Sequence, residues 1–181
     1  MNWRIGRTTD FSEEEYAAVY GSLSPSRRAH IDSFRHQGAR RQSLAGELLL
    51  RTLLTELSID AVPERLPNGQ PVLRGSDAFV SIAHCDEYVA CAVSQAPIGI
   101  DVERIRPIKP GMIQRVCTPE ERAYVQDSPE RFFEIWTAKE GYFKMMGTGI
   151  TDFQSVNTLT LPRHLIRQDD YLIQVIYMEK R

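Results

Sequence analysis

One amphipathic segment in the second half of the sequence constrains the fold more than any other. Residues 132–150 read FFEIWTAKEGYFKMMGTGI, and on a helical period of 3.6 residues their apolar side chains gather on one broad face. Trp136, Glu140 and Lys144 step by four along the border of that face, and Lys139 lies one position away. The sequence therefore predicts a helix that packs against a core and carries charged groups beside its apolar side.

These charged groups have two interpretations. A Glu and a Lys four residues apart often form a solvated pair that stabilises a helix by about 0.2–0.5 kcal/mol. Alternatively, a carboxylate and two ammonium groups at the edge of an aromatic stripe are costly to desolvate unless something pairs with them, which indicates a ligand. A second acidic site elsewhere in the chain favours the interpretation that these charged groups bind a ligand.

The segment at residues 97–103, PIGIDVE, supplies that second acidic site. As a β-strand it turns its Ile and Val side chains toward a core and points Asp101 and Glu103 together at the opposite face. Two neighbouring carboxylates repel each other, so the arrangement favours a cation between them. Because these are hard oxygen ligands with no His or Cys nearby, Mg²⁺ or a similar ion is favoured over zinc.

Two further features suggest anion binding. A strongly basic stretch at residues 27–41 precedes a leucine-rich helix predicted over residues 43–57. It is either a solvated basic face or an anion site, since Arg presents a fork suited to phosphate oxygens. His84 ends a strand predicted over residues 78–83 and is either structural or a donor to an anion. The glycine-rich loops of P-loop and Rossmann proteins are missing.

Composition narrows the class of protein. Hydrophobic residues make up 42% of the 181 residues and charged residues 25%, which is typical of a soluble globular protein. The net charge of −2 gives no general attraction for nucleic acid or anionic membranes. No apolar run suggests a signal peptide or a membrane span, and the three cysteines lack zinc or disulfide spacing. We therefore expect a cytoplasmic protein that binds neither nucleic acid nor membrane.

The order of the predicted elements indicates an α+β fold. An acidic turn before an aromatic-led strand occurs in each half, as CDEYVACAV and as QDDYLIQVIY, and strand-like runs cover residues 155–161 and 171–178. We expect one compact unit of two similar α/β lobes, residues 1–96 and 97–181, related by a pseudo-twofold axis. The active site would lie in the cleft between them, and the second lobe looks shortened.

The two acidic motifs together resemble a known family. GIDVE at residues 99–103 and WTAKEGYFK at residues 136–144 are similar to the signature pair of the 4′-phosphopantetheinyl transferases of the monomeric, surfactin-synthetase-activating type. Four other segments agree with that family in order: SLAGELLLR at residues 43–51, NGQP at 68–71, SIAHC at 81–85 and TPEE at 118–121. The resemblance extends from about residue 24 to residue 150.

The resemblance implies a specific reaction. The family transfers the phosphopantetheine arm of coenzyme A to a serine hydroxyl of an acyl or peptidyl carrier protein, and releases adenosine 3′,5′-bisphosphate. If the matching residues have the roles that they have in the family, Asp101, Glu103 and Glu140 would hold Mg²⁺ against the pyrophosphate. Either Glu140 or a water on the metal would accept the proton of the serine. A monomer is expected, because one chain supplies both lobes.

The resemblance also implies the other site residues. The catalytic group would comprise Glu140, Lys144 and His84. The residues expected to bind coenzyme A are Arg27, His30 and Arg41 near the 3′-phosphate, Gly69, Gln70 and Pro71 at the adenine, and His84, Lys139 and Lys144 at the phosphates. Glu121 matches an acidic position of the family without a settled role.

The sequence also departs from the family pattern. Ala83 stands in place of the usual Ser, Gln42 and Gln70 in place of frequent basic residues, and Gly141 in place of a small Ala or Ser. Two alternatives therefore stay open. One is a catalytically weak relative that binds coenzyme A and Mg²⁺, and the other is a metal-dependent phosphohydrolase, which the carboxylates alone would permit.

A second basic stretch, residues 104–115, carries Met112 and Ile113 and no acidic residue. Carrier proteins of the acyl carrier type are acidic around the modified serine, so this stretch is the predicted docking surface for the carrier. The alternative is a solvated basic loop.

Overall fold

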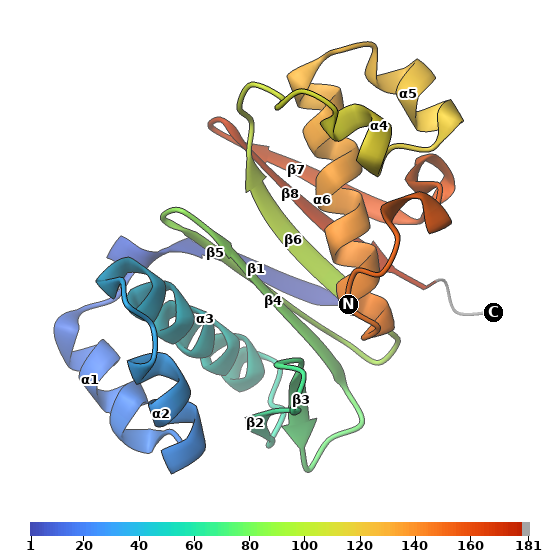
Figure 1. The fold of residues 1–181 in the computed structure, drawn as a ribbon. Coiled ribbons are helices and arrows are strands. Elements are labelled where there is room, and N and C mark those ends of the chain that lie inside the picture. The colour runs from blue at the N-terminus through green and yellow to red at the C-terminus, as the bar shows by residue number, and fades with distance from the viewer. Residues whose placement is uncertain (179–181) are drawn as a thin grey trace. The chain divides into compact units, whose positions relative to one another are not determined.

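The computed structural model describes residues 1–178, and the chain divides into two compact units, Met1–Gln95 and Ala96–Arg181. Each unit combines helices with a three-stranded sheet, and every strand pair in these sheets is antiparallel (Figure 1). The mixed α and β content agrees with the predicted α+β class. No helix among residues 1–178 is both long and apolar enough to cross a membrane.

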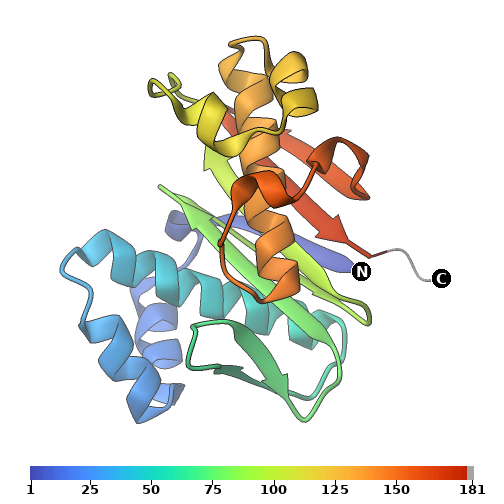
Figure 2. The same ribbon diagram turned by 45° about the vertical axis from the view of Figure 1, so that its right-hand side comes forward.

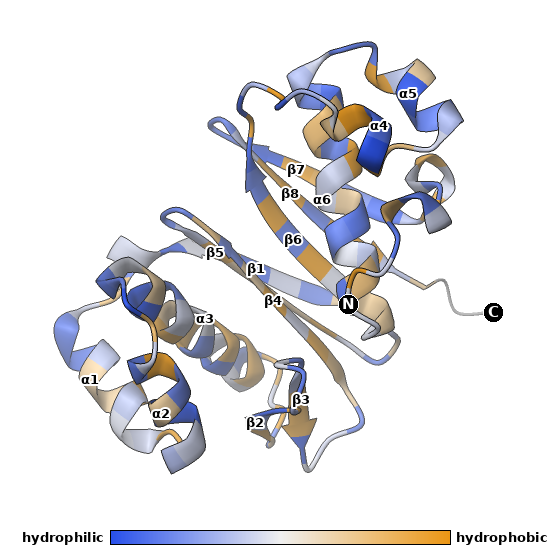
Figure 3. Ribbon diagram, in the orientation of Figure 1, coloured by the Kyte–Doolittle hydropathy of each residue, from blue (hydrophilic) through white to orange (hydrophobic). Residues whose placement is uncertain are grey.

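The first unit is built on one long helix. Its elements are β1 (Asn2–Arg7), α1 (Glu13–Ser22), α2 (Pro25–Asp32), α3 (Gln37–Glu56), β2 (Val62–Arg65), β3 (Pro71–Arg74), β4 (Phe79–Cys85) and β5 (Tyr88–Ser94). The sheet order is β1-β5-β4, and β2 and β3 form a separate hairpin. Leucines of α3 pack on the sheet in a core with Tyr16 and Val89. Hydrophobic and hydrophilic bands alternate along α3, as one buried face requires (Figure 3).

The second unit carries the two acidic motifs. Its elements are β6 (Ile98–Arg104), α4 (Met112–Val116), α5 (Pro119–Val125), α6 (Pro129–Met146), the 3₁₀ turns η2 (Phe153–Ser155) and η3 (Thr158–Thr160), β7 (Arg163–Gln168) and β8 (Tyr171–Tyr177). The sheet order is β6-β8-β7, so β8 is the central strand. Helix α6 crosses one face of this sheet (Figures 1 and 2).

Both ends of α6 follow from local sequence chemistry. Ser128 caps the N-terminus by accepting a hydrogen bond from the backbone N–H of Arg131, and Pro129 occupies the first helical turn. Gly147 ends the helix with a φ of +67°, in the left-handed region that glycine adopts without strain. The helix predicted within residues 132–150 is confirmed, although it begins three residues earlier and ends at Met146.

Two glycines set how closely α6 lies on β6. A Cβ placed on Gly99 of β6 would lie 1.8 Å from the carbonyl oxygen of Gly141 and 2.9 Å from the backbone nitrogen of Met145. The backbones of the strand and the helix are therefore in direct contact, with no side chain between them. This contact fixes which residues of α6 face the acidic end of β6.

The prediction of a strand over residues 155–161 is wrong. That segment forms the turns η2 and η3, because the side chains of Asp152 and Asn157 accept hydrogen bonds from the backbone N–H groups of Gln154 and Leu159. The strand of this region lies later, as β7, and it was not predicted. The prolines and Asn68-Gly69 of residues 62–74 predict turns around one short strand, and the structure has two short strands there, β2 and β3.

Candidate active site

Asp101 lies on β6 beneath α6, with 6% of its surface exposed. Its Oδ1 accepts a hydrogen bond of 2.7 Å from the ammonium group of Lys144, which lies in the last turn of the helix. Its Oδ2 is buried and has no hydrogen-bond partner within residues 1–178. A buried carboxylate oxygen without a donor is costly, so it marks a position suited to a cation.

Glu140 lies one helical turn before Lys144. Burial raises its pKa to about 7, with the charge of Asp101 adding to the rise and that of Lys144 opposing it. Burial likewise raises the pKa of Asp101 to about 6, although the ammonium of Lys144 lowers it and the charge of Glu103 raises it. Charge interactions thus connect the three predicted metal-binding carboxylates, although two lie on a strand and one lies on a helix distant in sequence.

Glu103 is held by donors from two sides. The indole Nε1 of Trp136 donates to its Oε1 at 3.1 Å, and Nη1 of Arg106 donates to its Oε2 at 2.9 Å. Trp136 and Glu140 are four residues apart on α6, so the same face of the helix reaches both Glu103 and Asp101. Sequence reasoning identified Trp136 as part of a motif, but it did not assign this contact.

These residues fit a hard divalent cation. Within residues 1–178 no three His, Cys, Asp or Glu side chains are already grouped tightly enough to hold a metal. Nevertheless, Asp101 has an oxygen without a donor, and the pKa values of Asp101 and Glu140 are raised by burial and by the charges of neighbouring carboxylates. A dication would relieve both effects, and carboxylate oxygens are the ligands that Mg²⁺ prefers.

The raised pKa values lead to a testable pH dependence. Because the ordinary values of Asp101 and Glu140 are 3.8 and 4.5, the folded chain binds more protons than the unfolded chain up to about pH 7. Their contribution to stability is therefore complete at low pH and lost as the pH rises through their folded-state values. We expect the metal-free chain to lose stability relative to its Glu140→Gln variant between roughly pH 5 and pH 8.

Thermal unfolding in EDTA across this range measures the difference between the two proteins. The comparison with the variant is needed because other carboxyl groups, such as Asp170 beside Arg104, have lowered pKa values and act in the opposite direction. Mg²⁺ should raise the midpoint of the unmodified chain most at the upper end of the range, since protons compete for the same oxygens. A difference that stays constant with pH would contradict the assigned burial of Glu140.

The prediction that Lys139 contacts phosphate is not supported by its position. Its ammonium group is fully buried and forms an ion pair of 2.8 Å with Glu121, whose side chain is also fully buried. It donates to the backbone carbonyls of Phe153 and Val156 at 2.7 and 2.6 Å. All three ammonium protons can thus be used inside the fold, which leaves none for a ligand. Lys139 lies four residues after Ile135, on the apolar face.

In the first unit, two arginines converge on one acid. Arg27 of α2 and Arg65 of β2 each place Nη2 within 3.0 Å of Oε1 of Glu47, and Arg27 also donates to Ser43. Glu47 belongs to α3 and is 2% exposed. Two guanidinium groups against one carboxylate leave an excess of positive charge, which suits an anion. Arg65 was missed, because a single Arg in a short strand gives no sequence signal.

The other residues predicted to bind the nucleotide have contacts of their own within the first unit. Arg41 forms an ion pair of 2.5 Å with Glu13 and lies over the ring of Tyr16, and the ring of His30 packs edge-on against Phe34. His84 lies on β4, in register with Val89 of β5. The three residues Gly69, Gln70 and Pro71 form the end of the β2-β3 turn, where Gly69 has a φ of +86° and the side chain of Asn68 accepts from the N–H of Gln70.

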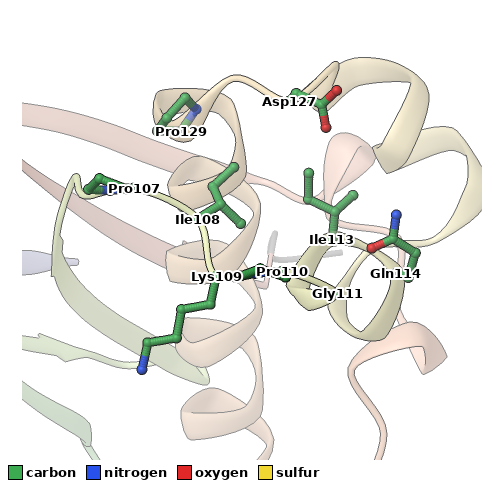
Figure 4. Close-up of a pocket in the computed structure, with 9 residues that line it drawn as sticks. All are labelled: Pro107, Ile108, Lys109, Pro110, Gly111, Ile113, Gln114, Asp127 and Pro129. Atoms are coloured by element: carbon green, nitrogen blue, oxygen red, sulfur yellow. The ribbon is translucent and has the colours of Figure 1, made fainter.

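A cavity of about 350 Å³ lies beside the second basic stretch (Figure 4). Its lining residues come from the segment after β6, from α4, from the loop between α5 and α6 and from the start of α6: Pro107, Ile108, Lys109, Pro110, Gly111, Ile113, Gln114, Asp127 and Pro129. Figure 4 shows Ile108 and Ile113 at its wall and the ammonium end of Lys109 directed away from the prolines. The basic stretch is thus a surface with an apolar recess.

Comparison with known proteins shows what the second unit is similar to. Residues 97–173 match the model of the 4′-phosphopantetheinyl transferase superfamily, and this range includes Asp101, Glu103, Glu140 and Lys144. The similarity to this superfamily therefore covers the residues that form the candidate site. The recognised resemblance is confirmed, and the acidic constellation of the second unit lies inside the matched region.

Individual relatives in the superfamily extend the match into the first unit. The chain is 34% identical over 141 residues to the 4′-phosphopantetheinyl transferase psf-1 of Bacillus pumilus, covering 71% of this chain and 60% of that protein. It is 33% identical over 123 residues to the transferase gsp of Aneurinibacillus migulanus, covering 60% and 49%. It is 28% identical over 150 residues to Sfp of Bacillus subtilis strain 168, covering 77% and 67%. The chain thus spans about half to two thirds of these relatives.

Proposed function

We propose that the chain is a 4′-phosphopantetheinyl transferase, which moves the phosphopantetheine arm of coenzyme A to a serine hydroxyl of a carrier protein. The observation that carries the proposal is the contact between the two family motifs: Lys144 of α6 binds Asp101 of β6, with Glu140 beside them. The names of the relatives support the reaction class. The release of adenosine 3′,5′-bisphosphate follows from the chemistry of coenzyme A.

In this proposal the residues of the second unit have distinct roles. Asp101, through its free Oδ2, and Glu140 and Glu103 would hold Mg²⁺. When bound, this ion would neutralise pyrophosphate oxygens and stabilise charge on the leaving group. Lys144 lies within reach of the same site and would bind a phosphate oxygen as a point charge. Either Glu140 or a water on the metal would accept the proton of the serine hydroxyl.

The first unit would bind the nucleotide part of coenzyme A. The excess positive charge of Arg27 and Arg65 around Glu47 supports a phosphate site there. The roles of His30, Arg41, His84 and of the turn at residues 69–71 stay predictions. So do the pseudo-twofold relation of the two lobes, the monomeric state, the cytoplasmic location, and the expectation that neither nucleic acid nor membrane is bound.

We propose the second basic stretch as the surface that docks the carrier protein. Lys109 and Arg115 are exposed and, within residues 1–178, form no ion pair, so their charge is available to an acidic partner. The cavity beside Lys109 would accept an apolar side chain of that partner. Arg104 and Arg106 are less suitable, because they pair with Asp170 and with Glu103.

Charge reversal tests this docking surface. The double variant Lys109→Glu and Arg115→Glu should lower kcat/KM for an acidic apo-carrier on the order of tenfold, with the KM for coenzyme A unchanged, because exposed charges steer association without forming the catalytic site. Transfer by the unmodified chain should weaken with added salt, whereas the variant should lose most of this dependence. The neutral pair Lys109→Gln and Arg115→Gln serves as the graded control. An equal loss for carrier and coenzyme A would refute the assignment.

A further inference from the structure

Phe153 lies outside both motifs, yet its ring contacts one of them. Its centroid is 5.0 Å from that of Trp136, with 29° between the planes, so the two rings stack. The ring of Phe143 meets Phe153 edge-on at 6.1 Å. Phe153 belongs to η2, which follows α6 in the chain, and its ring packs on Trp136 and Phe143 of that helix. The segment after α6 turns back along the helix (Figure 2). Phe153 therefore packs against the indole from a different element.

The indole that Phe153 contacts holds a candidate metal ligand. An indole has one hydrogen-bond donor, Nε1, and in Trp136 this donor lies 3.1 Å from Oε1 of Glu103. Stacking restricts the torsion angles of the Trp136 side chain, so it also restricts where the donor points. The orientation of Glu103 thus depends on a ring that does not touch it.

A buried ion pair keeps Phe153 in place. The ammonium of Lys139 donates to the carbonyl oxygen of Phe153 itself and to that of Val156. Lys139 is paired with Glu121, whose Oε1 accepts hydrogen bonds from the backbone N–H and the hydroxyl of Thr158, at 2.7 and 2.8 Å. These bonds attach residues 153–158 to both α5 and α6, and they are made in a region without solvent.

We propose that Phe153, anchored by the Lys139–Glu121 pair, is a positioning residue that orients Glu103 for metal binding through Trp136. The inference rests on the proposed function, because it assumes that Glu103 is a metal ligand. Partners beyond the ligands themselves orient metal-binding side chains, and their loss typically lowers metal affinity by about 10- to 100-fold. Lys139 and Glu121 thereby have a role in the site that differs from the predicted phosphate contact.

Phe153→Ala tests the proposal in a chain that also carries Trp3→Phe, so that Trp136 is the one remaining tryptophan. Mn²⁺, a paramagnetic substitute for Mg²⁺, is titrated into the protein while the electron paramagnetic resonance signal of the free ion is recorded. We expect the affinity for Mn²⁺ to fall about tenfold or more. The emission maximum of Trp136 should shift to longer wavelength, and iodide should quench this emission more strongly, because the indole loses the ring that covers it.

Val125→Ala is the matched control. Val125 is a fully buried member of the same hydrophobic cluster, so its truncation lowers the unfolding midpoint without removing the ring on Trp136. The control should keep the Mn²⁺ affinity and the emission of the parent protein. The proposal is overturned if Phe153→Ala binds Mn²⁺ as tightly as the parent, or if Val125→Ala loses as much affinity. A parent protein that binds no Mn²⁺ would instead overturn the metal site on which the proposed function depends.

Discussion

Among the glycine-to-alanine substitutions in the second unit, Gly99→Ala is expected to cause the largest loss of stability. The new Cβ would lie 1.8 Å from the carbonyl oxygen and 2.8 Å from the carbonyl carbon of Gly141. Both are backbone atoms, so no side chain can rotate away and α6 must move off β6. Overpacking of a core typically costs 1–3 kcal/mol, and we expect about 3 kcal/mol or more here.

In the same variant, the transfer rate of the molecules that remain folded should also fall. Moving α6 away from β6 separates Glu140 and Lys144 from Asp101, and a misplacement of about 1 Å at a reaction centre can cost about 100-fold in rate. Denaturant unfolding measures the loss of stability, and initial rates at a temperature where the variant is still folded measure the loss of activity.

Gly141→Ala is the matched control on the other side of this contact. Its Cβ would meet Cγ1 of Ile176 at 2.9 Å, so the atom that must shift belongs to a buried side chain and not to the backbone. Alanine also favours the helix by up to about 1 kcal/mol relative to glycine, so we expect a smaller loss of stability than for Gly99→Ala. If the two alanine variants prove equally stable, the backbone contact between Gly99 and Gly141 does not determine the position of α6.

Glu140→Gln is expected to abolish transfer while making the metal-free chain more stable at neutral pH. The amide keeps the shape of the side chain but loses the charge that would hold Mg²⁺ and the capacity to accept a proton, so we expect a loss on the order of 10³-fold in rate. The gain in stability follows because burial and the charge of Asp101 raise the pKa of Glu140 to about 7.

The opposite signs of these two effects make the test specific. Thermal unfolding in EDTA near pH 8 and transfer rates with Mg²⁺ measure them on the same preparation. Glu130→Gln is the control, since Glu130 lies on the same helix, is partly exposed and forms a surface ion pair with Arg167. Glu130→Gln should change neither the unfolding midpoint in EDTA nor the transfer rate with Mg²⁺ by much. If Glu140→Gln retains activity, Glu140 is neither a metal ligand nor a base.

The elements that carry the site could largely be predicted from the sequence. The spacing of apolar residues identified α6, and the alternation in PIGIDVE identified β6 with Asp101. The position of the helix on the strand could not be predicted, because spacing within each element does not specify how two elements meet. That position depends on the contact between Gly99 and Gly141, which gave no signal beyond a departure from the family pattern.

Lys139 shows the limit of assigning roles by residue type. A lysine beside a glutamate predicted to be catalytic was expected to bind phosphate, yet its place between Ile135 and Phe143, four residues from each, puts it on the buried face of α6. The helical spacing alone therefore predicts that Lys139 is buried, whereas its residue type favours an exposed, ligand-binding position. The acid that pairs with Lys139, Glu121, matched an acidic position of the family without a settled role, and the structure shows that it also completes a capping box with Thr118.

The most direct test of the proposed function is to incubate the chain with coenzyme A, Mg²⁺ and an apo-carrier protein and to measure the mass of the carrier. Metal-assisted transfer predicts a gain of about 340 Da, the mass of one phosphopantetheine group, which disappears when EDTA replaces Mg²⁺. A carrier whose mass does not change, with coenzyme A bound intact, would indicate a relative that binds without transfer. Release of free phosphate would indicate a phosphohydrolase, and either result would contradict the proposed function.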